Sequence, residues 1–113
     1  MESVRATDAA SAAVAKNQNT RVKLEDIESA IAAENTFVVG DAVAALGQPS
    51  HESLGILTVT VITMKNGFTV IGKTAPADPA NYSAELGHKF SREDAIRQLW
   101  PLMGFSLRDK LAA

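Results

Sequence analysis

The clearest hydrophobic pattern in the chain is a pair of β-branched and apolar runs, Ile56 to Met64 and Phe68 to Lys73, separated by Asn66-Gly67. Asn-Gly readily adopts the positive φ angles of a tight primed turn, so the runs are predicted to form an antiparallel hairpin with a two-residue loop. This register predicts one face with the pairs Lys65 and Phe68, Thr63 and Val70, Val61 and Gly72, and another with Met64 and Thr69, Ile62 and Ile71, Thr60 and Lys73.

Both faces of the predicted hairpin are largely apolar, which indicates that both are covered. The chain offers few elements to cover them. We therefore expect one cover to come from a second subunit, and the protein to be a homo-oligomer.

Apolar residues at helical spacing precede the hairpin. Leu24, Ile27 and Ile31 predict an amphipathic helix of about four turns, from Thr20 to Glu34 or Asn35, with acidic residues in its first turn. A short strand is predicted at 36–39 and a helical turn or packed loop at 41–46. Residues 47–55, with proline and two glycines, form a polar connector.

A longer helical pattern follows the hairpin. Asp78 is a good N-cap and Pro79 suits the first helical position, so a helix is predicted from Pro79 to about Trp100, where Pro101 ends it. Its buried stripe comprises Tyr82, Leu86, Phe90, Ile96, Leu99 and Trp100. Gly87 indicates a close helix-to-sheet approach, and Ser91 with Asp94 is predicted to recap the helix after a kink. A capping box at 106–109 predicts a short C-terminal helix.

Together these patterns predict an α+β fold: an N-terminal helix, a central antiparallel β-hairpin or small sheet, a long helix packed on the sheet, and a short C-terminal helix. Residues 1–20 are rich in alanine and poor in bulky apolar side chains, so they are predicted to be a flexible, partly helical tail. Residues 21–113 are predicted to be a single domain.

Composition narrows the classes of function. There is no cysteine, and His51 and His88 lie far apart, so neither a thiolate site nor a metal site is expected. A net charge of −2 argues against a protein that wraps nucleic acid. No apolar run approaches the ~20 residues of a membrane span, and the N-terminus lacks a signal-peptide pattern. We expect a cytoplasmic protein without membrane or nucleic-acid partners.

No catalytic constellation is recognisable. The chain has no serine elbow, no glycine-rich phosphate loop and no histidine near a candidate nucleophile, so we expect no enzyme activity and no cofactor. Glu93 and Asp94 are more simply interpreted as surface charge and capping. His51 fits either a ligand-binding or proton-shuttling group or, more commonly, an unpartnered surface histidine.

A nucleotide-binding site remains open. Such a site needs an aromatic face for the base, an amide for its edge and cations for phosphate. The candidate ligand-binding residues are Phe68, Asn81, Tyr82, Lys89, Arg92 and Arg97. A core position is equally compatible with Phe68 and Tyr82, and solvated helix faces are the simpler interpretation of the basic residues.

Several segments together resemble a widespread family of small phage and prophage proteins of unassigned function. The residues that carry the resemblance are 24–28, His51 with 53–55, Met64-Lys-Asn-Gly-Phe-Thr-Val-Ile-Gly72, Pro79-Ala-Asn-Tyr82, Glu85 with Gly87, and 94–104. The resemblance covers about residues 20 to 112. The family's usual cysteine after the hairpin is replaced here by Pro76 or Ala77, which argues against an essential thiol.

The pattern also resembles the Thoeris anti-defence protein one group. This resemblance implies an oligomeric sponge in the host cytoplasm that binds a cyclic ADP-ribose isomer and holds it without cleaving it. Adenine would stack on an aromatic ring and pyrophosphate would pair with arginine. The alternative is a phage accessory protein of unknown function that acts by binding a host protein.

Overall fold

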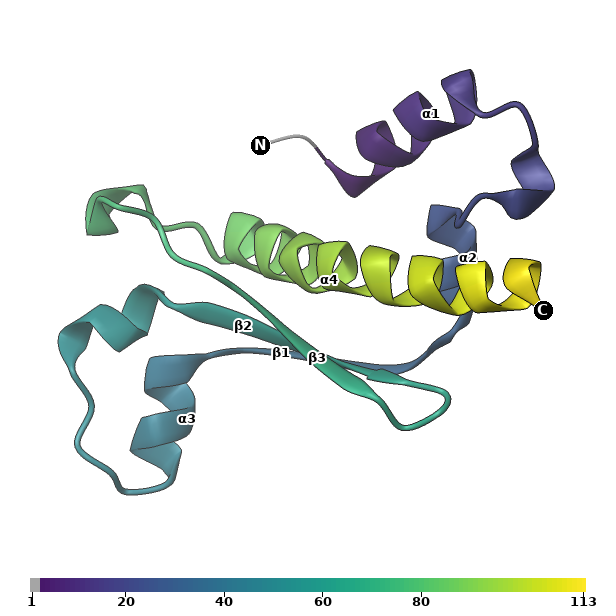
Figure 1. The fold of residues 1–113 in the computed structure, drawn as a ribbon. Helices are drawn as coiled ribbons and strands as arrows, with labels where there is room; N and C mark the ends of the chain where they lie inside the picture. Colours follow the sequence, from purple (N-terminus) through teal and green to yellow (C-terminus); the bar gives the residue numbers. More distant parts are fainter. Residues whose placement is uncertain (1–2) are drawn as a thin grey trace.

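The computed structural model describes residues 3–113, which form a three-stranded antiparallel sheet crossed on one face by a long helix (Figure 1). The strands are β1 (Ile31–Val38), β2 (Thr58–Met64) and β3 (Thr69–Thr74), in the order β1-β2-β3. The long helix is α4 (Ala84–Ala112), which packs chiefly on β3 and β2. The predicted α+β class with a helix on a small antiparallel sheet is therefore confirmed.

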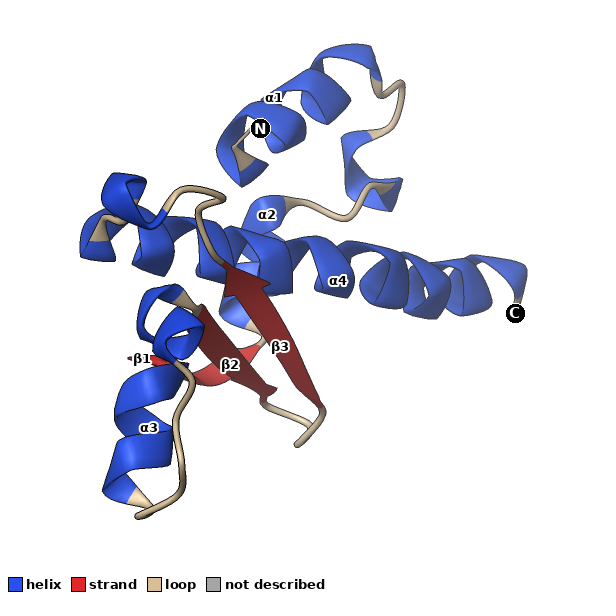
Figure 2. Ribbon diagram, turned by 90° about the vertical axis from the view of Figure 1, so that its left-hand side faces the viewer, coloured by secondary structure: helices blue, strands red, loops and turns tan. Residues whose placement is uncertain are grey.

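Shorter helices surround this unit. They are α1 (Val4–Val14), α2 (Leu24–Ser29) and α3 (Val39–Ala45), with 3-10 turns at Gln18–Thr20, Glu52–Ile56 and Pro79–Asn81. Helix α1 lies on the far side of α4 from the sheet, whereas α3 follows β1 and points away from α4 (Figure 2). One face of the sheet is thus covered by α4, and no helix of residues 3–113 lies across the other.

The core lies between the sheet and α4. Ile27, Ile62, Ile96 and Leu99 are almost completely buried there, and Met64 and Val70 complete the sheet side of the cluster. Burial of each such side chain contributes about 1.5–3 kcal/mol to folding.

Helix α4 can approach the sheet closely because small residues face each other. A Cβ atom on Gly72 of β3 would overlap the backbone of Ser91 and Ala95, and one on Gly87 would lie 2.5 Å from the Thr58 hydroxyl oxygen. The prediction that Gly87 marks a close approach of helix and sheet is confirmed.

A chain of buried hydroxyl groups lies at this junction. The Thr60 hydroxyl is 2.8 Å from that of Thr36 and 2.7 Å from that of Ser91, which also donates to the His88 carbonyl at 3.2 Å. Each of these three hydroxyl groups has a hydrogen-bond partner, so they are buried without the usual penalty. Ser91 therefore packs on the sheet, and α4 continues through it without being recapped.

The outer edge of the sheet at β3 is occupied by side chains of α4. Gln98 Nε2 donates to the Ile71 carbonyl at 2.7 Å, and the Lys73 amide donates to Asp94 Oδ2 at 2.9 Å. These bonds satisfy backbone groups that an edge strand would otherwise present to solvent.

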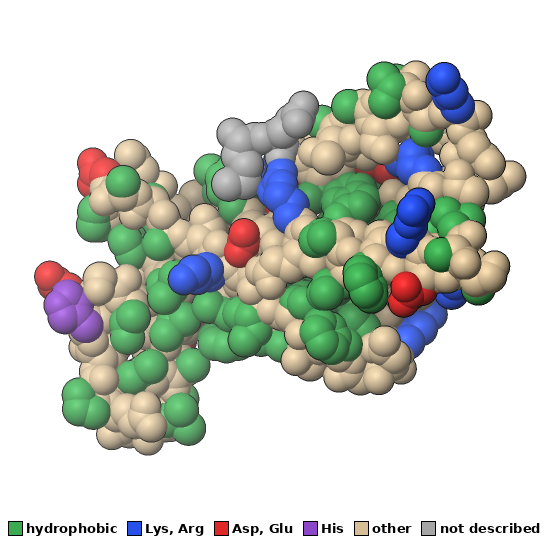
Figure 3. Space-filling view, in the orientation of Figure 1, with side chains coloured by type: hydrophobic (Ala, Val, Ile, Leu, Met, Phe, Trp, Pro, Cys, Tyr) green, Lys and Arg blue, Asp and Glu red, His purple; other side chains and the backbone are tan. Residues whose placement is uncertain are grey.

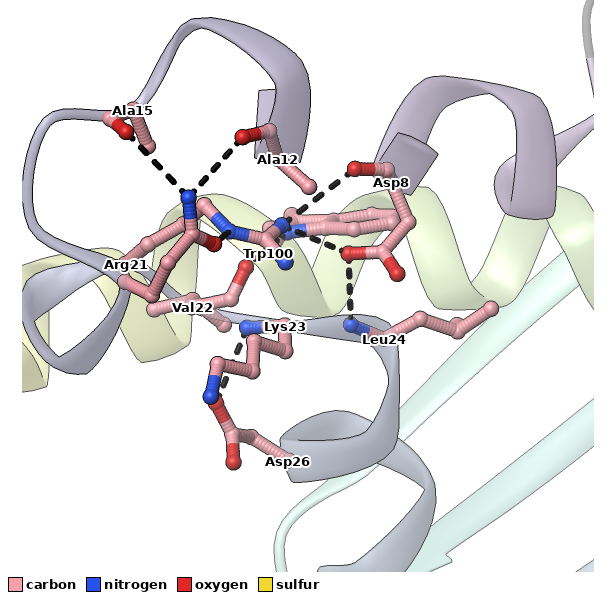
Figure 4. Close-up of polar contacts among 10 residues, drawn as sticks. Asp8, Ala12, Ala15, Arg21, Val22, Lys23, Leu24, Asp26 and Trp100 are labelled. Atoms are coloured by element: carbon pink, nitrogen blue, oxygen red, sulfur yellow. Dashed lines mark hydrogen bonds and ion pairs between the residues drawn. The ribbon is translucent and has the colours of Figure 1, made fainter. Parts of the chain in front are cut away.

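The N-terminal segment is held to the domain by a small polar cluster (Figure 4). Asp8 accepts hydrogen bonds from Arg21 NH1 at 2.7 Å and from the Leu24 amide at 3.1 Å. Trp100 Nε1 donates to the Val22 carbonyl at 3.0 Å. The sequence predicts a flexible tail over residues 1–20, whereas from Val4 onward the structure shows a helix packed on the domain; residues 1 and 2 lie outside the described part.

The hairpin register differs from the prediction by one residue. Ile62 pairs with Val70 and Thr60 with Gly72, so the loop contains three residues, 65–67. Within this loop only Gly67 has a positive φ, at 88°, and the Gly67 amide donates to the Met64 carbonyl. A primed turn needs a positive φ at Asn66 as well, so this is the turn-plus-bulge type of loop.

Three predicted helix boundaries are also wrong. The helix expected to reach Glu34 ends at Ser29, because residues 31–38 pair with β2 as β1. Helix α4 does not end before Pro101 but continues to Ala112, so there is no separate C-terminal helix. Asp78 and Pro79 begin only a 3-10 turn, and Ser83 is the N-cap of α4.

Candidate functional site

The six predicted ligand-binding residues do not form one site in the structure. Asn81 and Tyr82 line a cleft of 240 Å³ at the start of α4, whereas Phe68 lines an apolar groove of 440 Å³ near the hairpin tip. These two places lie at opposite ends of β3 (Figure 1). Lys89 and Arg92 line a third cavity, of 520 Å³, between α1 and α4.

The cleft at the start of α4 is the most nucleotide-like of the three. Its walls include two aromatic rings, those of Tyr82 and Phe90, both half-buried. Asn81 is exposed beside them and offers an amide group that can donate and accept hydrogen bonds. Gly87 also lines the cleft, where α4 lies so close to the sheet that a Cβ on Gly87 would be 2.5 Å from the Thr58 hydroxyl oxygen.

Phe90 lines the cleft but was not among the ligand-binding residues predicted from the sequence. It follows Tyr82 by eight residues, and a helical pattern assigns both to the core stripe. Nothing in this spacing separates the two rings from core residues. Lys89 Nζ lies 5.9 Å from the centroid of the Phe90 ring, so its cation is close to this wall of the cleft.

Arg92 is already engaged by two carboxylates. Its Nε is 2.7 Å from Glu34 Oε1, and its NH2 is 3.2 Å from Glu28 Oε2. The hydrogen bond to Glu34 is the main reason why the pKa of Arg92 is raised above its ordinary value. This arginine links α4 to β1 and α2, which is a structural role. Arg97 is half-buried on α4 and is not among the residues that line the three cavities.

The apolar groove near the hairpin tip lies between Phe68 and the middle of α4. Leu99, Leu102 and Met103 form its helical wall, and Ala30 and Met64 its floor. Phe68 is 52 % exposed, so it is neither a core residue nor fully free. Lys65 is the one charged residue that lines the groove.

Other residues considered from the sequence have structural roles. His51 is exposed, and its Nδ1 accepts the Ser53 amide at 3.1 Å as the cap of a 3-10 turn. Glu93 was expected on the surface but is buried, and it accepts the Val4 amide at 2.9 Å. Within residues 3–113 no group of three or more histidine, cysteine, aspartate or glutamate residues is arranged to hold a metal ion. Over the same residues, no helix is long and apolar enough to cross a membrane.

Comparison with known proteins identifies a family of phage proteins. The model of a family described as "Phage protein (N4 Gp49/phage Sf6 gene 66) family" matches residues 22–111. Neither the curated proteins nor the solved structures contain a match. The matched range includes the sheet, α2, α3 and nearly all of α4, and it excludes α1.

Proposed function

Because the chain belongs to the N4 Gp49/phage Sf6 gene 66 family of phage proteins, we propose that it is a phage-encoded anti-defence protein that sequesters a nucleotide signal. The proposed ligand is a cyclic ADP-ribose-type nucleotide, bound in the host cytoplasm and not cleaved. The resemblance of the sequence to the Thoeris anti-defence sponges supports the choice of ligand.

The observation that carries the proposal is the pair of aromatic rings in the cleft at the start of α4. Adenine would stack on Tyr82 or Phe90, and the Asn81 amide would bond to the edge of the base. The cleft measures 240 Å³, which is less than the roughly 300–1,000 Å³ of pockets that enclose a drug-sized ligand. It therefore suits the base alone, with the pyrophosphate lying outside and drawn to Lys89.

The lining of the cleft also favours binding over cleavage. None of the residues that form it is a histidine, aspartate, glutamate or lysine, so no lining side chain is a general base at neutral pH. Its hydroxyl groups belong to Thr58, Thr74, Tyr82 and Ser83. Ser83 already serves as the N-cap of α4 by accepting the Leu86 amide.

Calorimetric titration of the full chain with cyclic ADP-ribose isomers tests the proposal. The complex is then heated and the released ligand is identified by chromatography. Binding with release of intact ligand is the expected result. Absence of heat with every isomer at protein concentrations well above micromolar, or release of a cleaved product, would refute sequestration.

Matched variants test the site itself. Base-to-aromatic stacking is worth about 1–3 kcal/mol, so Tyr82→Ala should weaken binding by roughly 5- to 150-fold, whereas Tyr82→Phe should retain most of it. Phe105→Ala removes an exposed ring elsewhere on α4 and should leave affinity unchanged. Equal losses in Tyr82→Ala and Phe105→Ala would place the ligand elsewhere.

The apolar groove favours a second candidate function, the binding of a host protein. Phe68 and Leu102 remain 52 % and 45 % exposed at its rim, and such exposed apolar rims are typical of protein contacts. A host protein captured from lysate should form a complex with the purified chain. The substitution Leu102→Asp should disrupt that complex. A complex that survives Leu102→Asp would exclude the groove as its site.

A further inference from the structure

The two edges of the sheet differ in how they are covered. At β3, side chains of α4 bond to the backbone of Ile71 and Lys73, whereas no strand of residues 3–113 pairs with the outer side of β1. Residues 32–35 of β1 are all exposed. Edge strands are commonly guarded by proline, lysine or a covering element, yet residues 33–38 contain neither proline nor lysine. Such an edge can pair with an extended segment of another protein.

The backbone groups on the free side of β1 follow from its pairing with β2. The Val39 amide donates to the Leu57 carbonyl at 2.9 Å, so every second residue before Val39 also bonds towards β2. The amide and carbonyl groups of Glu34 and Thr36 therefore point away from the sheet. Within residues 3–113 these groups have no backbone partner on that side. They are spaced to bond with the backbone of one incoming strand.

The side chains along this edge differ between the two faces. Glu34 lies on the α4 face near Glu28, and Arg92 sets one positive charge against these two carboxylates, which remain 34 % and 46 % exposed. Side chains alternate along a strand, so Phe37 lies on the other face, where it is 41 % exposed. Figure 3 shows hydrophobic side chains gathered below α4, on the side of the sheet and of α3. The edge is thus acidic on one face and apolar on the other.

We propose that β1 binds an extended segment of another protein, which adds as an antiparallel strand and carries an apolar residue three positions before a lysine or arginine. The residues opposite Phe37 and Glu34 have this spacing, and their side chains fall on opposite faces. The apolar side chain packs on Phe37, and the cation pairs with Glu34 and Glu28. Because β1 lines none of the three cavities described above, this inference does not depend on the proposed ligand.

The β1 strand of a second copy of this chain is a poorer occupant of the edge. Residues 31–38 contain no lysine or arginine, so a second β1 cannot supply the cation. It would instead bring another Glu34 to the acidic side, where like charges repel. A basic segment of a different protein therefore fits the edge better.

Fluorescence anisotropy of a labelled peptide with the full chain is the first test. The probe is Lys-Thr-Phe-Thr-Val-Lys-Thr-Lys, blocked at both ends. A methyl group on the amide of the threonine after phenylalanine, which faces Thr36, removes a backbone hydrogen bond and should weaken binding by about tenfold or more. A methyl group on the amide of the next residue, valine, points away from β1 and should change affinity by less than about twofold. Equal losses in both, or no binding of the unmethylated probe at hundreds of micromolar protein, would overturn the proposal.

Variants of the chain test the charge. Glu34→Gln should weaken binding of the probe by about two- to fivefold, as expected for an exposed ion pair, and Asp109→Asn near the end of α4 should leave it unchanged. Equal effects of the two changes would contradict the predicted pairing.

Amide hydrogen exchange measured by NMR locates the bound probe. The probe should slow exchange at Glu34 and Thr36 and leave Ile71, at the opposite edge, unchanged. Slowing at Ile71 alone would place the probe on β3 and overturn the proposal. Protection of Glu34 and Thr36 that grows with protein concentration in the absence of the probe would overturn it too, because a second copy would then occupy the edge.

Discussion

Gly72 of β3 lies against the backbone of Ser91 in α4, so closely that a Cβ atom on Gly72 would overlap the Ser91 carbonyl oxygen. The same Cβ atom would lie 2.4 Å from the backbone nitrogen of Ala95, and because both obstacles are backbone atoms, no flexible side chain can move aside to make room. The distance between the helix and the sheet is thus fixed by the absence of one methyl group.

Gly72→Ala should therefore destabilise the fold by about 1–3 kcal/mol, the usual cost of overpacking a core. Urea denaturation measures the free energy of unfolding. The matched control is Gly104→Ala in α4, where an added Cβ meets nothing within 4 Å. This control should stabilise the protein by about 0.5–1 kcal/mol through helix propensity. If both substitutions stabilise, the close approach is absent in solution.

Ser91→Ala removes one member of the buried hydroxyl chain that includes Thr36 and Thr60. Because the Thr60 hydroxyl loses a partner in a dry environment, we expect a loss of about 1–2 kcal/mol in unfolding free energy. Ser106→Ala, at an exposed position of α4, should be neutral or slightly stabilising. Indistinguishable effects of the two changes in urea melts would argue against a stabilising role for the hydroxyl chain.

Arg92→Met should weaken the links from α4 to Glu28 and Glu34 by about 1 kcal/mol, a typical value for a partly exposed ion pair. The difference from the wild type should shrink as salt is added. Lys89→Met removes a cation from an adjacent exposed position, where no ion pair with Lys89 is seen in the described chain. Its melting temperature should change little at any salt concentration, and a salt-independent effect of Arg92→Met would point to lost packing instead.

Asp8 should make the attachment of the N-terminal segment depend on pH. The hydrogen bond from Arg21 is the main reason why the pKa of the Asp8 carboxyl is lowered. A lowered folded-state pKa stabilises the protein above the unfolded-state value, and that contribution is lost as pH falls through the folded-state pKa. Asp8→Asn should therefore be less stable than wild type at pH 7, with the gap closing below about pH 4. Melts from pH 7 to pH 2.5 measure this gap.

The control for this prediction is Asp109→Asn, at an exposed position near the end of α4. The difference in stability between Asp109→Asn and the wild type should not change in this way with pH. The single tryptophan provides a local signal, because Trp100 donates to Val22 next to the Asp8 and Arg21 pair. A pH-independent gap for Asp8→Asn would mean that the charge of Asp8 does not hold the segment.

The fold class followed from the sequence because two local signals agreed: the β-branched runs on either side of Asn66-Gly67, and the helical spacing from Pro79 to about Trp100. The errors came where tertiary packing outweighs local preference. Ala32, Ala33 and Glu34 are good helix formers, yet they lie in β1 because β2 supplies a partner for their backbone. Pro101 is exposed, and the flanking Leu99 and Met103 pack on the core, so α4 passes through it.

The hairpin register could not be read from Asn66-Gly67 alone, since a bulged three-residue loop uses the same dipeptide. Packing under α4 decides the register: Ile62, Val70 and Gly72 must share one face, and of the predicted and observed registers only the observed one puts them together.

The candidate site was predictable only in part. Asn81 and Tyr82 do line a common cleft, but the carboxylates that engage Arg92 come from β1 and α2, far away in sequence.

The two side chains of α4 that bond to the backbone of β3 have a consequence for aggregation. An unpaired edge strand is a template on which further chains add, the first step toward fibrous aggregates. Gln98 and Asp94 already occupy the Ile71 carbonyl and the Lys73 amide that an incoming strand would use. The protein is therefore expected to reach high concentrations without polymerising along this side.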